Sequence, residues 1–277
     1  MILVTGTKRS GTSMWMQILM AAGFTSFGSA FPANWGQSIK EANSQGFFES
    51  RLREGIYYRT NPHPETGQFL FPHATRRHLV KVFIPGLVRS DYAYLDHVVA
   101  SIRPWRDYCS SLERLCSIED AFMEKTGGQD AVEKARAKRS PFPPEIEWWF
   151  ENYELIRDLA TRRYPFQLIA HGRLLAEPRG TIEKVLSFLE DGQTPLNVEA
   201  ALAVVEPKLS GRSPSNYQSE YLNPQDIDVF DAVYASIHGD GRLSAELINA
   251  LNETQNRLAK RFTLDWREQS SETRKTG

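Results

Sequence analysis

The chain has 277 residues, of which 41% are hydrophobic and 24% are charged. Such a composition supports a sizeable core and excludes wholesale disorder, and the length suits one large α/β domain or two smaller domains. The 33 lysines and arginines nearly balance the 34 aspartates and glutamates. A binder of nucleic acids or anionic membranes that works through bulk charge is therefore disfavoured, and any anion site must be local.

The cysteines and the N-terminal sequence favour a cytoplasmic protein. Cys109 and Cys116 are the only two cysteines, and on one expected helix they lie about 10 Å apart, beyond disulfide reach. The first residues lack the charged and long apolar regions of a signal peptide, and the longest apolar run, 14–24, is too short to span a bilayer. We therefore expect reduced thiols and no membrane span.

Short apolar runs alternate with segments of helical periodicity, which is typical of a parallel sheet with crossover helices. In chain order we expect strands at 2–5, 79–84, 97–102 and 166–170, helices at 12–22, 105–116, 144–163 and 179–189, and two helices within 226–262 that break at 239–241. The pattern predicts one three-layer α/β domain over 1–268, with a central parallel sheet flanked by helices, and a frayed tail at 269–277. Residues 25–78 and 118–144 fit this scheme poorly and are typical of substrate-binding or lid segments, although for the second a surface insertion is an equal alternative.

A phosphate-binding loop is predicted between the first strand and the first helix. The loop Gly6-Thr7-Lys8-Arg9-Ser10-Gly11-Thr12-Ser13 differs from the nucleotide-triphosphate pattern G-x-x-x-x-G-K-[ST] only where Thr12 replaces the lysine. Backbone N–H groups and the start of a helix bind phosphate oxygens in this context, so Ser10, Gly11, Thr12 and Ser13 are candidate ligands together with the cations Lys8 and Arg9. A purely structural turn between strand and helix is the alternative.

The other strand ends lack a Mg²⁺-binding aspartate, since Pro85-Gly86, Arg103-Pro104 and His171-Gly172 follow the apolar runs. We therefore expect a phosphate ester that is bound without a metal. Arg103 leaves the third expected strand, and Ser111 lies in the first turns of the next helix. Both side chains can converge on one phosphate.

These motifs together resemble those of the cytosolic and Golgi sulfotransferases that use 3′-phosphoadenosine 5′-phosphosulfate (PAPS). Arg9-Ser-Gly-Thr-Ser13 matches the family's [KR]-S-G-T-[ST] loop, and Arg103 with Ser111 matches its R-x(7)-S element. A third stretch, 168–189, is similar to the family's "Y-E-D-L-x-x-x-P" turn and helix, and the resemblance covers about residues 1–215. It implies a P-loop-type fold, PAPS as donor and 3′-phosphoadenosine 5′-phosphate (PAP) as product, with Arg212 closing over the 3′-phosphate.

The general base departs from the family's commonest pattern. Phe83 stands where animal members carry a histidine, so we favour Glu49, because other branches use a glutamate and the preceding glycine and aromatic residues would raise its pKa. Lys8 and Arg9 would hold the charge that grows on the leaving phosphate. Glu49 capping a helix or pairing with a nearby arginine, and His73 or His78 as the base, stay open as alternatives.

The sequence thus favours a sulfotransferase that transfers the sulfuryl group to a hydroxyl or amine. The acceptor is an unidentified small molecule, sugar or lipid. A P-loop kinase for a small metabolite and a non-catalytic nucleotide-binding protein are the alternatives. We expect neither a metal nor a nucleic-acid partner, and whether the chain forms a homo-oligomer stays open.

Overall fold

The computed structural model describes residues 1–27, 29–30, 48–50, 52–192, 195–205 and 215–273, with backbone only at 29–30, 49 and 263–273. Five parallel strands form one sheet in the order β2-β5-β1-β6-β7. Their bounds are Ser26–Phe27 (β2), Leu79–Lys81 (β5), Ile2–Thr5 (β1), His97–Ile102 (β6) and Phe166–Ala170 (β7). A separate antiparallel pair joins β3 (Ser29–Ala30) to β4 (Phe48–Glu49).

Three expected strands, 2–5, 97–102 and 166–170, are confirmed to the residue. The expected strand 79–84 was too long, because β5 ends at Lys81 and helix α2 (Ile84–Arg89) begins three residues later. Pro85 occupies the first turn of that helix, where its missing N–H is harmless, whereas a central strand needs that donor.

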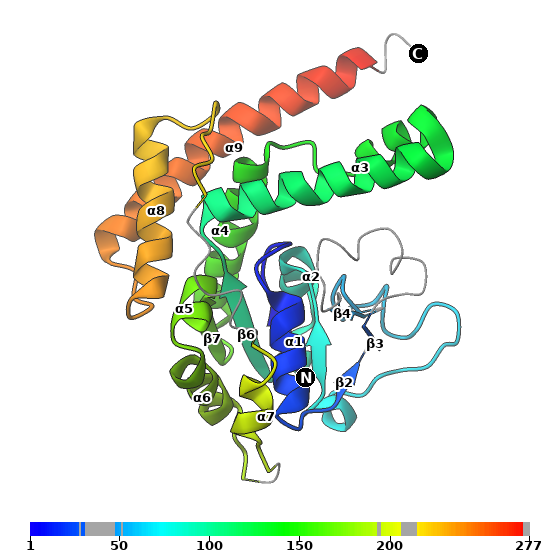
Figure 1. Ribbon diagram of the computed structural model, residues 1–277, viewed down its shortest axis with the longest axis vertical. Helices are drawn as coiled ribbons and strands as arrows, with labels where there is room; N and C mark the ends of the chain where they lie inside the picture. Colours follow the sequence, from blue (N-terminus) through cyan, green and yellow to red (C-terminus); the bar gives the residue numbers. More distant parts are fainter. Residues whose placement is uncertain (28, 31–47, 51, 193–194, 206–214, 274–277) are drawn as a thin grey trace.

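Helices cover both faces of the sheet (Figure 1). Ile2 and Val4 on β1 pack in one core cluster with α1 (Thr12–Ala21) and α6 (Pro178–Leu189), and α7 (Val198–Leu202) joins this side. Leu3, which points the opposite way, packs in a second cluster with α2 and α4 (Pro144–Arg162). Because alternate residues of one strand are buried on opposite faces, the expected three-layer α/β arrangement with a central parallel sheet is confirmed.

Helix α3 is much longer than the expected 105–116. It runs over Trp105–Arg136 and is interrupted at Gly128, whose φ of 69° reverses the chain. The second arm folds back on the first, since Arg136 and Arg139 form ion pairs with Asp120 at 3.0 and 2.6 Å. The segment 118–144 is therefore mostly a helical hairpin, because a single glycine with positive φ suffices to turn it.

The C-terminal part forms α8 (Pro224–His238) and α9 (Ala245–Thr273), so the two expected helices are confirmed, and α9 continues into the segment expected to be frayed. α8 packs on α4, where Phe230 stacks on Trp149 with 4.4 Å between ring centroids. Trp148 and Trp149 are thus core residues. Among the helices in the described ranges, none combines the length and apolarity needed to cross a membrane.

The start of α8 carries a capping box. The Asn223 side chain accepts from the Asp226 N–H at 2.8 Å, and Asp226 accepts from the Asn223 N–H at 3.2 Å. Asn223→Ala should lower the free energy of unfolding by about 1 kcal/mol, measured by urea denaturation. Asn256→Ala, at an exposed position within α9, is the control, and an equal loss in both variants would contradict a capping role.

Candidate functional site

The loop between β1 and α1 is held mainly by its own polar groups. The Ser10 N–H donates to the Thr7 carbonyl at 3.2 Å, and the hydroxyls of Thr7 and Ser10 lie 2.9 Å apart. The Ser101 hydroxyl on β6 donates to the Ser10 carbonyl at 2.7 Å. Ser10 is fully buried and its side chain shapes the loop, whereas its contact with a ligand stays a prediction.

The first turn of α1 faces the sheet edge with a glycine as its N-cap. Gly11 has a φ of 86° and no side chain that could accept a hydrogen bond from the first N–H groups of the helix. The Ser13 hydroxyl accepts hydrogen bonds from the buried Lys81 ammonium at 3.2 Å and from the Phe48 N–H at 3.1 Å. An uncapped N-terminus beside buried positive charge is favourable for an anion.

The second predicted element meets this loop directly. Arg103 follows β6, and Ser111 lies in the second turn of α3. The Arg9 Nε donates to the Ser111 hydroxyl at 3.0 Å, and Arg103 donates to the Arg9 carbonyl at 3.1 Å. Arg9 has a φ of 68°, in the left-handed region. Residues expected at two strand ends are thus brought together, with one guanidinium on the Ser111 hydroxyl and the other on the Arg9 carbonyl.

A third strand end contributes His171, which follows β7 and begins α5 (His171–Ala176). Its buried Nδ1 has no hydrogen-bond partner among the described residues. The ring lies against the loop, because a Cβ on Gly11 would come within 2.7 Å of Nδ1. Burial, and then the positive charge of Arg103, lower the pKa of His171 from 6.5 to about 3. His171 was not among the residues predicted for the site, although its position at the end of a strand was a usable signal.

The lowered pKa of His171 predicts acid sensitivity. In the unfolded chain the imidazole is protonated as the pH falls below 6.5, whereas in the folded protein it is protonated only near pH 3. The unfolded state therefore binds more protons between these two pH values, and the free energy of unfolding decreases as the pH falls. The expected cost is about 1.4 kcal/mol by about pH 5.5. His171→Asn should flatten this dependence in urea titrations, whereas His73→Asn, at an exposed position, should not. Parallel curves for wild type and His171→Asn would contradict the assignment.

The two loop cations point in different directions. Whereas Arg9 reaches α3, the Lys8 Nζ lies 3.3 Å from Glu147 Oε1 on α4. A cavity of about 350 Å³ opens beside this ion pair. It is lined by Lys8, Lys138, Arg139, Ser140, Phe142, Glu147, Phe150 and Glu151. Sequence analysis did not identify Glu147 or Glu151, for which the signal was two carboxylates four residues apart on an amphipathic helix.

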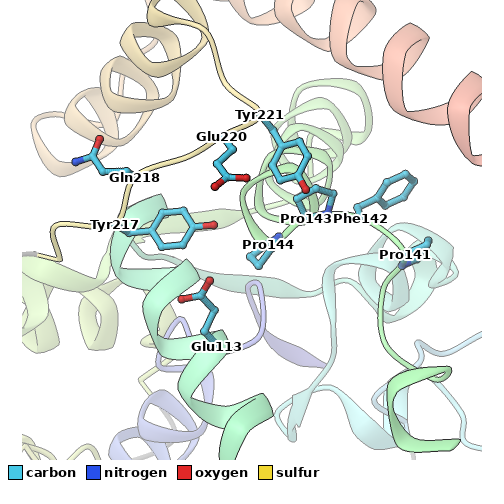
Figure 2. A pocket seen from close by; sticks show the side chains of 9 residues that line it. All are labelled: Glu113, Pro141, Phe142, Pro143, Pro144, Tyr217, Gln218, Glu220 and Tyr221. Atoms are coloured by element: carbon cyan, nitrogen blue, oxygen red, sulfur yellow. The ribbon is translucent and has the colours of Figure 1, made fainter. Parts of the chain in front are cut away.

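A second cavity, of about 510 Å³, adjoins the first through Phe142, which lines both. Figure 2 shows Glu113 from α3 facing Tyr217, Glu220 and Tyr221 from the segment that precedes α8. Its other lining residues are Pro141, Phe142, Pro143, Pro144 and Gln218. Burial, and then the nearby Glu145 carboxylate, raise the pKa of Glu113. This cavity is therefore acidic and partly aromatic.

The remaining predicted residues are only partly described. Glu49 belongs to β4, where its backbone pairs with Ser29, but its side chain is not among those described. Arg212 lies outside the described residues. The described chain continues at Ser215, whose N–H donates to Asp107 on α3 at 2.8 Å. Both cysteines are free, as expected.

No family model matches this chain, and no curated protein matches it in sequence.

Proposed function

We propose that this protein is a cytoplasmic sulfotransferase of the P-loop type that uses PAPS as donor and releases PAP. The observation that carries the proposal is the contact between the two predicted phosphate motifs, in which Arg9 donates to Ser111 at 3.0 Å while Arg103 donates to the Arg9 carbonyl. A ligand with phosphates at both ends of an adenosine needs two such anion sites on one sheet edge.

The residues present fit this ligand. Gly11 has a left-handed conformation and supplies no capping side chain at the start of α1, and Arg9, Gly11, Thr12 and Ser13 would hold the 5′-phosphosulfate end. Arg103, Ser111 and Arg212 would hold the 3′-phosphate. PAPS supplies an activated sulfuryl group. Lys8 and Arg9 provide the positive charge that stabilises the leaving phosphate, since preformed charge at this place lowers the barrier.

Transfer also requires a group that takes the acceptor's proton. Glu49 is the sequence-based candidate, and β4 lies near α1 because the Phe48 N–H donates to Ser13. The acceptor is a small molecule, sugar or lipid that offers a hydroxyl or an amine.

Calorimetry with PAP and with ATP, each with and without Mg²⁺, tests the proposal. We expect micromolar PAP binding that needs no Mg²⁺ and is not matched by ATP. A preference for ATP with Mg²⁺ would indicate the small-metabolite kinase instead. Tight PAP binding without transfer of labelled sulfate to any acceptor in a broad screen would indicate a non-catalytic nucleotide-binding protein. Absence of PAP binding would overturn the proposal outright.

A further inference from the structure

The cavity beside Lys8 combines a cation of the phosphate loop with two carboxylates of α4. Glu147 and Glu151 are four residues apart, so they lie on the same face of the helix and one turn apart. Glu147 is engaged by Lys8 at 3.3 Å. Glu151 lines the same cavity and, within the described part of the chain, forms neither a hydrogen bond nor an ion pair with another side chain. The Glu147 carboxylate is thus bound to the loop, while the Glu151 side chain lines the cavity.

We propose that this cavity is the acceptor site and that Glu151 takes the proton from an acceptor hydroxyl. The inference rests on the proposed function and deepens it, since Lys8 belongs both to the cavity lining and to the loop assigned to the donor. An acceptor in this cavity lies next to the place where the sulfuryl group would be held. Glu151 lies on α4, the helix that pairs with Lys8, whereas Arg9 contacts Ser111 on α3.

The surroundings of Glu151 suit a base. Burial, and then the negative charge of Glu147, raise its pKa to about 8, and Lys8 acts in the opposite direction. The other charged or titratable groups around it are Lys138 and Arg139 across the cavity and Tyr108 on α3, whose own pKa is raised by burial and then by Glu147 and Glu151. A base whose pKa lies near the working pH transfers protons most effectively.

The lining also indicates the class of acceptor. Phe142 and Phe150 form an apolar wall, with ring centroids 5.2 Å apart. Of the three lining cations, Lys8 is paired with Glu147 and Arg139 with Glu119 and Asp120, whereas Lys138 forms no ion pair with another described residue. An ammonium group is disfavoured in such a lining, whereas an anionic group next to the exposed Lys138 is favoured. We therefore assign an acceptor that carries a hydroxyl and an anionic group on an apolar body.

Transfer of the sulfuryl group to the acceptor hydroxyl forms one bond and breaks one. The acceptor oxygen forms a bond to sulfur, the bond from sulfur to the bridging phosphate oxygen breaks, and the electron pair of that bond leaves with the phosphate. The hydroxyl proton passes to Glu151, and no electrons are gained or lost overall.

The role of Glu151 is tested with Glu151→Gln. We expect kcat to fall about 10²–10⁴-fold, as for loss of a general base, while PAP binding measured by calorimetry stays within about twofold. In the wild type kcat should rise with pH through about 8, and this limb should be absent in the variant. Glu154→Gln, on the same helix but paired with Arg157 at 2.5 Å, is the matched control. Glu49→Gln is assayed in parallel, and loss of turnover there with full activity in Glu151→Gln would overturn the inference.

The acceptor class is tested with three phenols that differ only in charge, namely 3-(4-hydroxyphenyl)propionate, 4-ethylphenol and tyramine. Binding to the PAP-saturated protein and transfer from labelled donor should both follow the order anionic, neutral, cationic. Lys138→Gln should lower the preference for 3-(4-hydroxyphenyl)propionate over tyramine by at least about tenfold. Preference for tyramine, or binding of none of the three while PAP still binds, would overturn the acceptor assignment. Absence of PAP binding to the wild type would instead remove the proposed function.

Discussion

Gly6→Ala should be the most destabilising single substitution in the loop between β1 and α1. A Cβ at this position would lie 2.3 Å from the Ser101 carbonyl oxygen and 2.9 Å from the Ser10 hydroxyl, at a φ of 151°. Neither neighbour can move easily, because Ser101 is in register with Ile169 inside the sheet and Ser10 is fully buried. Backbone strain and overpacking together should cost about 3–5 kcal/mol of unfolding free energy.

Urea denaturation followed by circular dichroism measures this loss. Gly67→Ala is the matched control, since Gly67 also has a positive φ (68°) but no atom lies within 4 Å of its added Cβ. The control should lose only the conformational part, about 1 kcal/mol. Similar losses in the two variants would show that the contact with Ser101 does not fix the loop.

Arg103→Ala should abolish most PAP binding, with an affinity loss of about 100-fold, or about 2.7 kcal/mol. Two effects add here. The variant loses a cation at the proposed 3′-phosphate site, and it also loses the hydrogen bond that holds the Arg9 carbonyl at 3.1 Å. Because Arg9 is assigned to the 5′-phosphosulfate end, the second effect reaches the other end of the ligand.

Isothermal calorimetry with PAP gives the affinity, and Arg106→Ala is the control of equal charge. Arg106 is three residues further along the chain, where it pairs with Asp231 at 2.8 Å and lies over the Trp105 ring. Its removal should change the affinity by no more than about threefold, as for a surface ion pair. Equal losses in both variants would indicate a response to net charge and would remove Arg103 from the site.

Local signals predicted four of the five strands of the main sheet and one side of the candidate site, whereas the two-residue strand β2 was missed and β5 ends earlier than expected. The strands at 2–5, 97–102 and 166–170 have the expected bounds, because short, mostly apolar runs that end at Gly6, Arg103-Pro104 and His171-Gly172 mark buried parallel strands. Arg9, Arg103 and Ser111 meet because the carboxyl ends of neighbouring parallel strands share one edge. This rule can be applied without knowledge of side-chain packing, so the meeting of these residues can be predicted from the sequence alone.

The other side of the site depended on tertiary structure. Lys8 and Glu147 are 139 positions apart, and no local pattern specifies which helix faces a loop cation. The packing of α4 against α2, α3 and α8 determines that Glu147 on this helix faces Lys8. The same holds for His171, whose pKa depends on burial and on Arg103. The sequence alone predicted most strands of the sheet and the loop between β1 and α1, because these follow from short-range patterns. Packing decided which carboxylate faces that loop, because contacts between distant segments form only in the folded chain.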